Sequence, residues 1–373
     1  MFLWNPLRRT NSEWTRLFAL AAFVVVAGCT EDPTSSGTPT AGPPGRLYVA
    51  NQTDSTVYVY NTETLERVDS FPAGIVQPHF IRFSDDLSFF YLLSRDGPPG
   101  RIAKFDATTN EMLASAPLPG VFPTSMAITP DGTFGYVCDF SAAGVETRVY
   151  KVNLQSLTIV DSISAGASTH DADITSDGSL VVATNMSDII TMIYTDADTV
   201  HQVSIDPDSI YAVTRQKYMP YGLTIDHKDS LAYIACLDHH EVLAQVRVLD
   251  LALRQIVDSF YLPIDHIVHY GDPSGPTLVE LSPDDAYLYI TTQFDNTIQV
   301  LRLATRTVQE IPVEVGRTFG VSCTDDGSRV YITAAGVVPT QQGRVYILDG
   351  TTHDLIDSLD VGKNPFGLRW RPL

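Results

Sequence analysis

The feature that most limits the fold of this chain is a motif that recurs along most of its 373 residues. Each copy is an apolar stretch, a turn such as "TPDG" or "SPDD", and a second apolar stretch, with apolar residues alternating on both sides of the turn. This pattern is typical of a β-hairpin. Six copies begin at Pro78, Pro123, Thr169, Pro220, Pro276 and Thr318, so their starts lie 45, 46, 51, 56 and 42 residues apart. A repeat of this length predicts an array of similar β-sheet units.

A second hairpin follows each first one, and the two kinds differ in number. Seven stretches such as "VYVYNTETLERVDSF" read as second hairpins, against six complete first hairpins. The piece "RLYVANQ", residues 46–52, has no strand before it, and the C-terminal "PFGLRWRPL", residues 365–373, has no strand after it. Pairing the two chain ends supplies the seventh first hairpin.

We therefore predict an all-β fold, a seven-bladed β-propeller of four-stranded antiparallel blades. The ring is closed by pairing the C-terminal strand with the N-terminal blade, which removes the exposed edges that an open array would present. Residues 46–373 provide about 47 residues for each blade, which is normal for this architecture. Trp370 is expected to pack between blades.

Several second strands carry a family resemblance. "LYVAN" (47–51), "VVATN" (181–185), "YIAC" (233–236) and "YITT" (289–292) resemble the signature of YVTN-type, YncE-like seven-bladed propellers. The resemblance covers the chain after residue 45 and extends to surface-layer-associated proteins, and more distantly to propeller lactonases and the propeller of nitrous oxide reductase. Thr replaces the usual Pro at positions 169 and 318. Propellers host many functions, so the resemblance implies the fold and not the chemistry.

The N-terminal segment resembles the signal of a bacterial lipoprotein. Three arginines precede the apolar run of residues 17–28, which as a helix would span about 18 Å, too short for a membrane of roughly 30 Å. Its "VAGC" ending resembles a lipobox, so residues 1–28 are expected to be removed and Cys29 lipidated; an ordinary secretory peptide is the alternative. Residues 29–45 would be a disordered tether rich in Ser, Thr, Pro and Gly. We expect the protein in the cell envelope, at the outer membrane rather than the inner one.

The charge of the chain excludes some classes of partner. Removal of residues 1–28 takes away three Arg and one Glu and leaves a formal net charge of −22. A domain with this negative charge repels the phosphate backbone of nucleic acids, and the sequence shows no basic stripe. We therefore expect no nucleic acid partner. Membrane attachment should rest on the lipid alone.

One ring of residues is predicted at the mouth of the central channel. The residue after each repeat start should lie on the face conventionally called the top, and an aromatic and polar rim there suits a ligand site. These residues are His79, Thr124, His170, Tyr221, Thr277, Phe319 and Phe366. Asp171, and His266 and His269 from the long loop 261–275, are further candidates for the same site.

Two interpretations of the histidines are open. Neutral imidazoles bind Zn or Cu, so His79, His170, His266 and His269 could hold a transition metal. The alternative is that each is solvated or hydrogen-bonded, and on that basis no cofactor is expected. The Asp residues of the recurring turns need no function, since hairpin turns favour them. Cys138, Cys236 and Cys323 lie in strands of different blades and are predicted to be small buried fillers without disulfides.

The sequence favours a function in binding over catalysis. We expect a non-catalytic, lipid-anchored propeller that binds a protein, a peptide or a cell-envelope component through its top face. A structural tile of a surface layer is a related alternative. The alternative is a propeller enzyme, a lactonase-like hydrolase or a metal-dependent oxidoreductase, with His79 and His170 as base or ligands.

Overall fold

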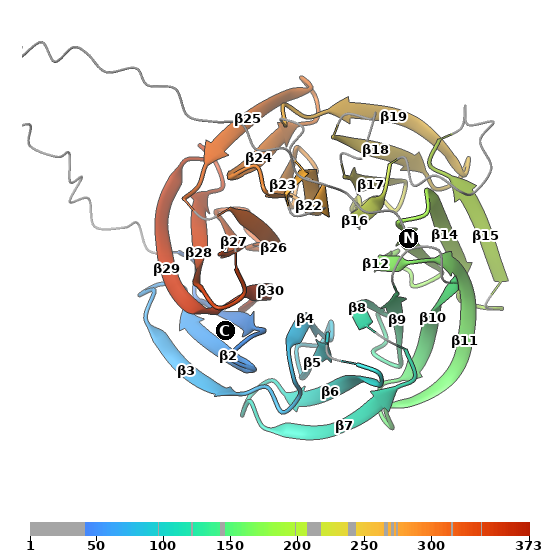
Figure 1. Cartoon of the computed structure of the whole chain (residues 1–373), viewed down its shortest axis with the longest axis horizontal. Coiled ribbons are helices and arrows are strands. Elements are labelled where there is room, and N and C mark those ends of the chain that lie inside the picture. Colours follow the sequence, from blue (N-terminus) through green and yellow to red (C-terminus); the bar gives the residue numbers. More distant parts are fainter. Residues whose placement is uncertain are drawn as a thin grey trace, which may run out of the picture. The chain divides into compact units, whose positions relative to one another are not determined.

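The described residues form a closed ring of seven four-stranded antiparallel blades, and the last two blades are joined into one eight-stranded sheet where Gln293 pairs with Arg317 (Figure 1). The computed structural model describes residues 42–373, apart from residues 96, 121, 142–145, 198, 207–217, 238–243, 265–267, 270–271, 274, 315 and 337. The predicted signal peptide, Cys29 and most of the tether therefore lie outside the described residues. Within the described part, no helix has the length and apolar character needed to cross a membrane.

Each blade runs from an innermost strand beside the channel to an outermost strand at the rim. The strands of blades 1 to 4, innermost first, are β30 (Pro365–Pro372), β1 (Gly45–Asn51), β2 (Thr56–Asn61) and β3 (Arg67–Pro72); β4 (Pro78–Phe83), β5 (Phe89–Ser94), β6 (Gly100–Asp106) and β7 (Met112–Leu118); β8 (Phe122–Ile128), β9 (Phe134–Phe140), β10 (Glu146–Asn153) and β11 (Thr158–Ala167); and β12 (Thr169–Ile174), β13 (Leu180–Asn185), β14 (Ile189–Tyr194) and β15 (Thr199–Ser204). Those of blades 5 to 7 are β16 (Pro220–Ile225), β17 (Leu231–Cys236), β18 (Gln245–Asp250) and β19 (Gln255–Tyr261); β22 (Gly275–Leu281), β23 (Tyr287–Gln293), β24 (Thr297–Arg302) and β25 (Thr307–Pro312); and β26 (Arg317–Cys323), β27 (Arg329–Ala335), β28 (Gln342–Asp349) and β29 (Leu355–Lys363).

The predicted closure of the ring is confirmed. β30 from the C-terminus pairs antiparallel with β1, with Leu47 opposite Trp370 and Val49 opposite Leu368. In Figure 1 the blue strands of the N-terminal blade lie beside the red strands of blade 7. Trp370 is buried in an apolar cluster with Tyr331 and other side chains of blade 7, so its predicted place between blades is also confirmed.

The hydrophobic core is divided among the contacts between neighbouring blades. Seven apolar clusters of the described residues each join two adjacent blades, from blades 1 and 2 round to blades 7 and 1. The tyrosines that open the second-strand motif lie in them, and Tyr48, Tyr91, Tyr136, Tyr289 and Tyr331 are among the largest fully buried side chains. Each blade is therefore stabilised by apolar contacts on both faces.

The recurring turns follow from local hydrogen bonding. In the first hairpins a Ser or Thr hydroxyl donates to an Asp two residues later, as Thr129 does to Asp131 and Thr324 to Asp326. The same Asp accepts backbone N–H groups, which lowers its pKa; at Asp131 the bond from Thr129 has the largest effect. The prediction that these carboxylates serve the hairpin turns is confirmed.

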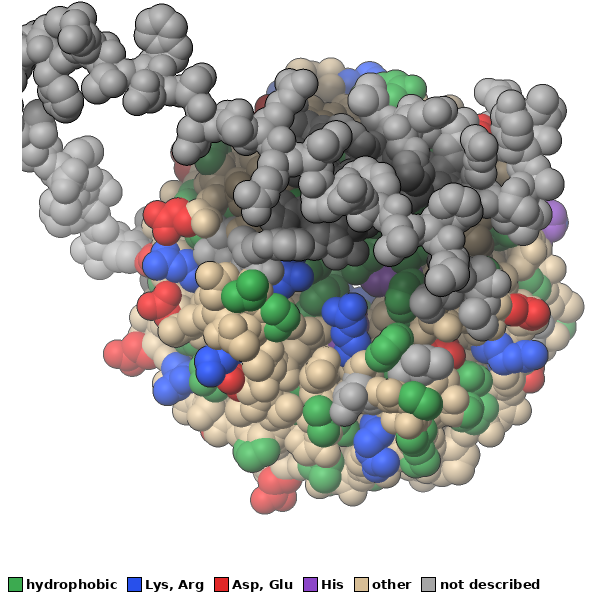
Figure 2. Space-filling view, viewed as in Figure 1, with side chains coloured by type: hydrophobic (Ala, Val, Ile, Leu, Met, Phe, Trp, Pro, Cys, Tyr) green, Lys and Arg blue, Asp and Glu red, His purple; other side chains and the backbone are tan. Residues whose placement is uncertain are grey.

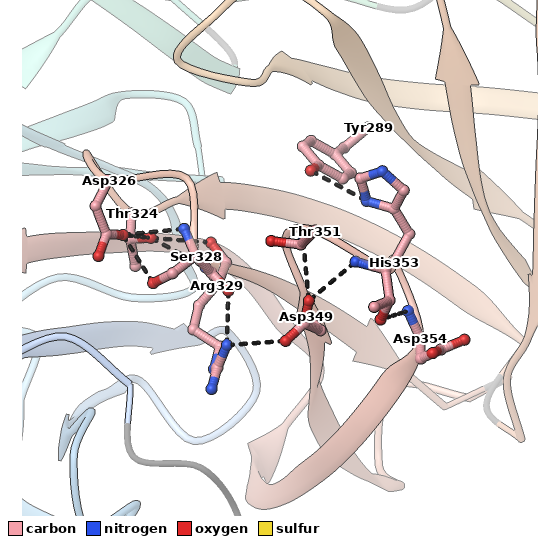
Figure 3. A network of polar contacts seen from close by, with 10 residues as sticks. Tyr289, Thr324, Asp326, Ser328, Arg329, Asp349, Thr351, His353 and Asp354 are labelled. Carbon is pink, nitrogen blue, oxygen red and sulfur yellow. Dashed lines mark hydrogen bonds and ion pairs between the residues drawn. The ribbon is translucent and has the colours of Figure 1, made fainter.

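A polar network closes the outer hairpin of blade 7 (Figure 3). The Asp349 carboxylate accepts the Thr351 N–H at 2.9 Å and lies 3.3 Å from Nη1 of the buried Arg329. His353 adopts a left-handed backbone with φ of 62°, and its ring packs against Tyr287 and Tyr289 of blade 6. Burial lowers the pKa of this imidazole, so His353 acts here as an uncharged packing residue.

The three cysteines of the described strands lie as expected. Cys138 and Cys236 are buried, Cys323 is half-buried, and none of the three forms a disulfide. Burial raises the pKa of each thiol, which disfavours the reactive thiolate. Their predicted role as small fillers is confirmed.

Deleting residues 364–373 should remove the innermost strand of blade 1 and open the ring. The apolar faces of blades 1, 2 and 7 would then reach water, so we expect loss of a single cooperative thermal transition, measured by calorimetry or circular dichroism. Removal of Leu373 alone is the matched control, because that residue is exposed. A melting transition unchanged by the longer deletion would contradict the closure.

Candidate functional site

Every innermost strand carries a β-bulge at the same place. Pairing with the second strand slips by one residue between the repeat start and the third residue after it, as between Thr169 and Ala172 in β12 and between Pro276 and Val279 in β22. Equivalent irregularities occur in the other five innermost strands. A bulge bends its strand and re-aims side chains. The first residue after each start is therefore released from regular pairing beside the channel, and so is the second, except in β4 and β8, where Phe80 pairs with Leu93 and Ser125 with Cys138.

A threonine of the second strand fills this bulge in three blades. The Thr184 hydroxyl accepts the N–H of Asp171 at 3.0 Å and donates to the Tyr221 carbonyl of the next blade at 2.7 Å. Thr333 makes the same two contacts, with Gly320 at 2.8 Å and with the Phe366 carbonyl at 2.7 Å. Thr291 fills the bulge of blade 6 by accepting the Leu278 N–H at 2.9 Å, but there Thr277 makes the contact to the next blade, donating to the Thr318 carbonyl at 3.0 Å. Threonine hydroxyls thus connect neighbouring blades at the level of the channel mouth.

These bulged segments surround a cavity of about 300 Å³ along the ring axis. Its lining includes His79, Thr124, His170, Asp171 and Phe366, so the sequence correctly brought these residues to one place. Figure 2 shows a His side chain and Lys or Arg side chains beside the hollow at the centre of one face. His79 and His170 are not solvated, and His79 contacts Gln52, which agrees with the hydrogen-bonded form of the second interpretation. The strands enclose the ring of first residues, so that all of it is buried except the half-buried Tyr221.

Aromatic stacking holds the two predicted histidines. His79 stacks on Phe366 with ring centroids 3.7 Å apart, and Phe366 stacks on Phe319 at 4.3 Å. Across the ring, His170 lies against Tyr221 at 3.6 Å. The aromatic candidates of the sequence therefore serve as supports for the imidazoles, and fix the planes of both rings.

Burial sets the charge of both imidazoles. It lowers the pKa of His79 well below the usual range, with Arg95 and His170 acting in the same direction, and lowers the pKa of His170 to about 3. Both rings are therefore neutral near pH 7. Nε2 of His79 is buried and makes no hydrogen bond within the described part of the chain.

Asp171 titrates closer to neutrality. Burial raises the pKa of its carboxyl to about 6, although that carboxyl accepts the N–H groups of Ala172 and Leu223, each at 3.0 Å. A group with this pKa exchanges its proton readily near pH 7. Of the candidate side chains that the structure describes, Asp171 is thus the one suited to proton transfer.

A ring of charges lies deeper in the channel, and sequence reasoning missed it. Arg82 pairs with Asp173 at 3.4 Å, and Arg369 pairs with Glu280 at 3.0 Å. Each of the four is the fourth residue after a repeat start, which places it about 6–7 Å below Asp171 and its counterparts. Reading this fourth position round the aligned repeats would have found the ring. Since the lower walls contain equal numbers of these positive and negative groups, the ion pairs offset each other.

The predicted contribution of the long loop is only partly described. His266 lies outside the described residues, and His269 is described by its backbone alone, in the two-stranded ribbon of β20 (Val268–His269) and β21 (Asp272–Pro273). Among the side chains that are described, no three His, Cys, Asp or Glu residues are placed to hold a metal ion. The metal alternative, with Zn or Cu, stays a prediction.

Comparison with known proteins gives one family and several similar folds. A family model described as "Lactonase, 7-bladed beta-propeller" matches residues 37–335. No curated protein sequence matches the chain significantly. The periplasmic gluconolactonase PpgL of Pseudomonas aeruginosa is 16% identical, with a TM-score of 0.69 over 87% of this chain and 98% of that one. Hydrazine synthase of Kuenenia stuttgartiensis is 21% identical, with a TM-score of 0.60 over 73% and 76% of the two chains. At these identities the two structures show a shared fold. The YncE-like and lipoprotein assignments stay predictions.

Replacing Thr184 by Val should remove both contacts that the bulge of blade 4 makes through this side chain. Valine has the same shape, so the loss is that of two buried hydrogen bonds, and we expect the free energy of unfolding to fall by about 1–3 kcal/mol. Denaturant titration measures this change. Thr158→Val is the control, because Thr158 is exposed on the outermost strand β11. Equal stability of the two variants would contradict the role of the bulge threonine.

Proposed function

Because the chain belongs to the seven-bladed β-propeller lactonase family, we propose that it is a hydrolase that opens a small cyclic ester in its central cavity. The observation that carries this proposal is the meeting of a carboxyl with a pKa near 6 and two neutral imidazoles in one enclosed space. Such a combination supplies a proton acceptor and polar groups of fixed orientation, and two backbone N–H groups stabilise the ionised form of the acceptor.

The family corrects one expectation from the sequence. The interpretation that the chain is non-catalytic was wrong, because the family model and the structural similarity to a gluconolactonase point toward catalysis. The signature of the second strands describes how blades are joined and therefore contains no information on the cavity.

In the proposed reaction Asp171 is the general base. Its carboxylate takes a proton from water while the water oxygen bonds to the ester carbonyl carbon, and negative charge develops on the carbonyl oxygen. The ring C–O bond then breaks, and the proton on Asp171 passes to the leaving alkoxide oxygen. The product is a hydroxy acid, and the enzyme returns to its initial state. A base with a pKa of about 6 is ionised at pH 7 and is returned to that state in each cycle.

The imidazoles fit this reaction better as polar contacts than as bases. With pKa values far below neutrality, His79 and His170 bind protons too weakly to compete with Asp171. The cavity volume of about 300 Å³ is at the small end of ligand pockets, which favours a substrate of one ring.

The test is a hydrolysis assay of the purified protein with five- and six-membered lactones, corrected for the rate without enzyme. We expect turnover that rises with pH and levels off above about pH 6, because the base must be ionised. Asp171→Asn should lower kcat/KM by about 10²–10⁴. Asp161→Asn, on the exposed edge of β11, should leave it unchanged.

Two outcomes would count against the proposal. Lactone binding by calorimetry without any turnover would instead support a binding module. Turnover without an inflection near pH 6, or undiminished in Asp171→Asn, would remove Asp171 from the reaction.

We also propose that the enzyme is held in the cell envelope by lipid on Cys29, as the sequence predicts. Cys29→Ala, expressed in a Gram-negative host, should move the protein from the membrane fraction to the soluble fraction after cell lysis, and labelling with a fatty acid analogue should be lost. Continued membrane attachment of the variant would contradict a lipid anchor at this residue.

A further inference from the structure

Three polar side chains lead to His79 from blades 7 and 1. Nη2 of Arg317 lies 3.5 Å from Oδ1 of Asn364, Nδ2 of Asn364 lies 2.7 Å from Oε1 of Gln52, and Nε2 of Gln52 lies 2.5 Å from Nδ1 of His79. A backbone bond of 3.1 Å from Gln52 N–H to the Asn364 carbonyl runs alongside. We name this series of contacts the relay. Its end at Gln52 and His79 is almost fully buried, whereas Asn364 and Arg317 are half-buried.

The contacts favour one direction along the relay, because its first member, which also donates to the Gly336 carbonyl at 2.8 Å, can only donate. A guanidinium has no hydrogen-bond acceptor, so Asn364 must present its oxygen to Arg317 and its NH₂ group to Gln52. Gln52 then accepts through its oxygen and donates through its own NH₂ group. Nδ1 of His79 must therefore be an acceptor, and in a neutral imidazole the ring proton is then on Nε2.

The far side of the His79 ring is left without a partner. The ring is only 2% exposed and is stacked on Phe366. Its Nε2 makes no hydrogen bond to the residues that the structure describes, yet His79 lines the central cavity. A buried N–H without an acceptor costs free energy, and in a cavity a ligand oxygen is the group that would satisfy it.

We infer that Arg317, Asn364 and Gln52 fix His79 as a neutral Nε2–H donor that bonds the carbonyl oxygen of the substrate and stabilises the charge that develops there. The catalytic half of this inference rests on the proposed lactone hydrolysis, whereas the position of the proton does not. Gln52, Asn364 and Arg317 are positioning residues, and His79 supplies the donor. In the proposed reaction, the donor and the base Asp171 are thereby separate groups.

The proton position can be measured directly. Long-range ¹H–¹⁵N spectra of the full chain, labelled at histidine, distinguish the two neutral tautomers at pH 7.5, and the His79 signals are assigned by their loss in His79→Gln. We expect the Nε2–H form. In Gln52→Glu the carboxylate can only accept, so the proton should move to Nδ1 and leave Nε2 as an acceptor. Gln202→Leu, at an exposed site of β15, should leave the His79 signals unchanged.

Kinetics then test the role of the donor. With the lactones of the hydrolysis assay, Gln52→Glu should lower kcat about 10²–10³-fold with little change in KM, as expected for the loss of a transition-state donor. Gln52→Leu removes the donor to Nδ1 without fixing the other tautomer, so a smaller fall in kcat is expected. Thermal unfolding of both variants checks that they fold.

Each outcome bears on a different part of the inference. A wild-type His79 in the Nδ1–H form, or protonated on both nitrogens at pH 7.5, would overturn the relay, and this measurement needs no variant that folds. The expected tautomer together with an unchanged kcat in Gln52→Glu would overturn the role of His79 in the reaction. The expected tautomer in a protein that opens no lactone would leave the relay in place and reject the proposed function.

Discussion

Closure of the ring is the constraint on which the remaining structure depends. Because β30 from the C-terminus pairs with β1 from the N-terminus, all seven blades have a neighbour on both sides and all seven apolar clusters are complete. An open array would leave two blade faces and the edge of a second strand in water. Closure also fixes the distance of the innermost strands from the axis, so the width of the cavity is a property of the whole ring and not of any one blade.

The same contacts that join the blades also position the candidate site. Two bulge threonines donate to the carbonyl of the first residue after the repeat start in the next blade, Thr184 at Tyr221 and Thr333 at Phe366. Tyr221 and Phe366 are in turn the rings on which His170 and His79 lie. A shift of one blade would therefore be transmitted to the imidazole of its neighbour. This explains how short repeats, each of marginal stability, can hold side chains in the fixed orientation that catalysis requires.

The sequence predicted the fold well because strand alternation, turn chemistry and repeat length are local properties that survive in the ring. It also placed His79, His170 and Asp171 at one channel, since equivalent positions of a repeat meet at the axis. It failed where the answer depended on which residues meet across the ring. Three features depend on contacts between segments far apart in sequence. They are the burial of the histidines, the pairing of Arg82 with Asp173, and the relay through Gln52 and Asn364. The sequence did not single out the lactonase family for a further reason, since the signature motif reflects how blades pack against each other.

The electrostatics of the cavity separate into two levels with different physical origins. At the upper level, burial lowers the pKa of His79 and His170 and raises that of Asp171, so each isolated group is moved toward its neutral form. At the lower level, Arg82 and Arg369 keep their charge, because each guanidinium has a carboxylate partner. A substrate in this cavity would thus have its reacting carbonyl beside two neutral imidazoles and a single carboxylate, where one added N–H donor has a large effect on a developing charge. Paired charges at the level of the reacting carbonyl would form hydrogen bonds with each other and not with the substrate. This is a physical reason for the ion pairs to lie at a different level from His79, His170 and Asp171.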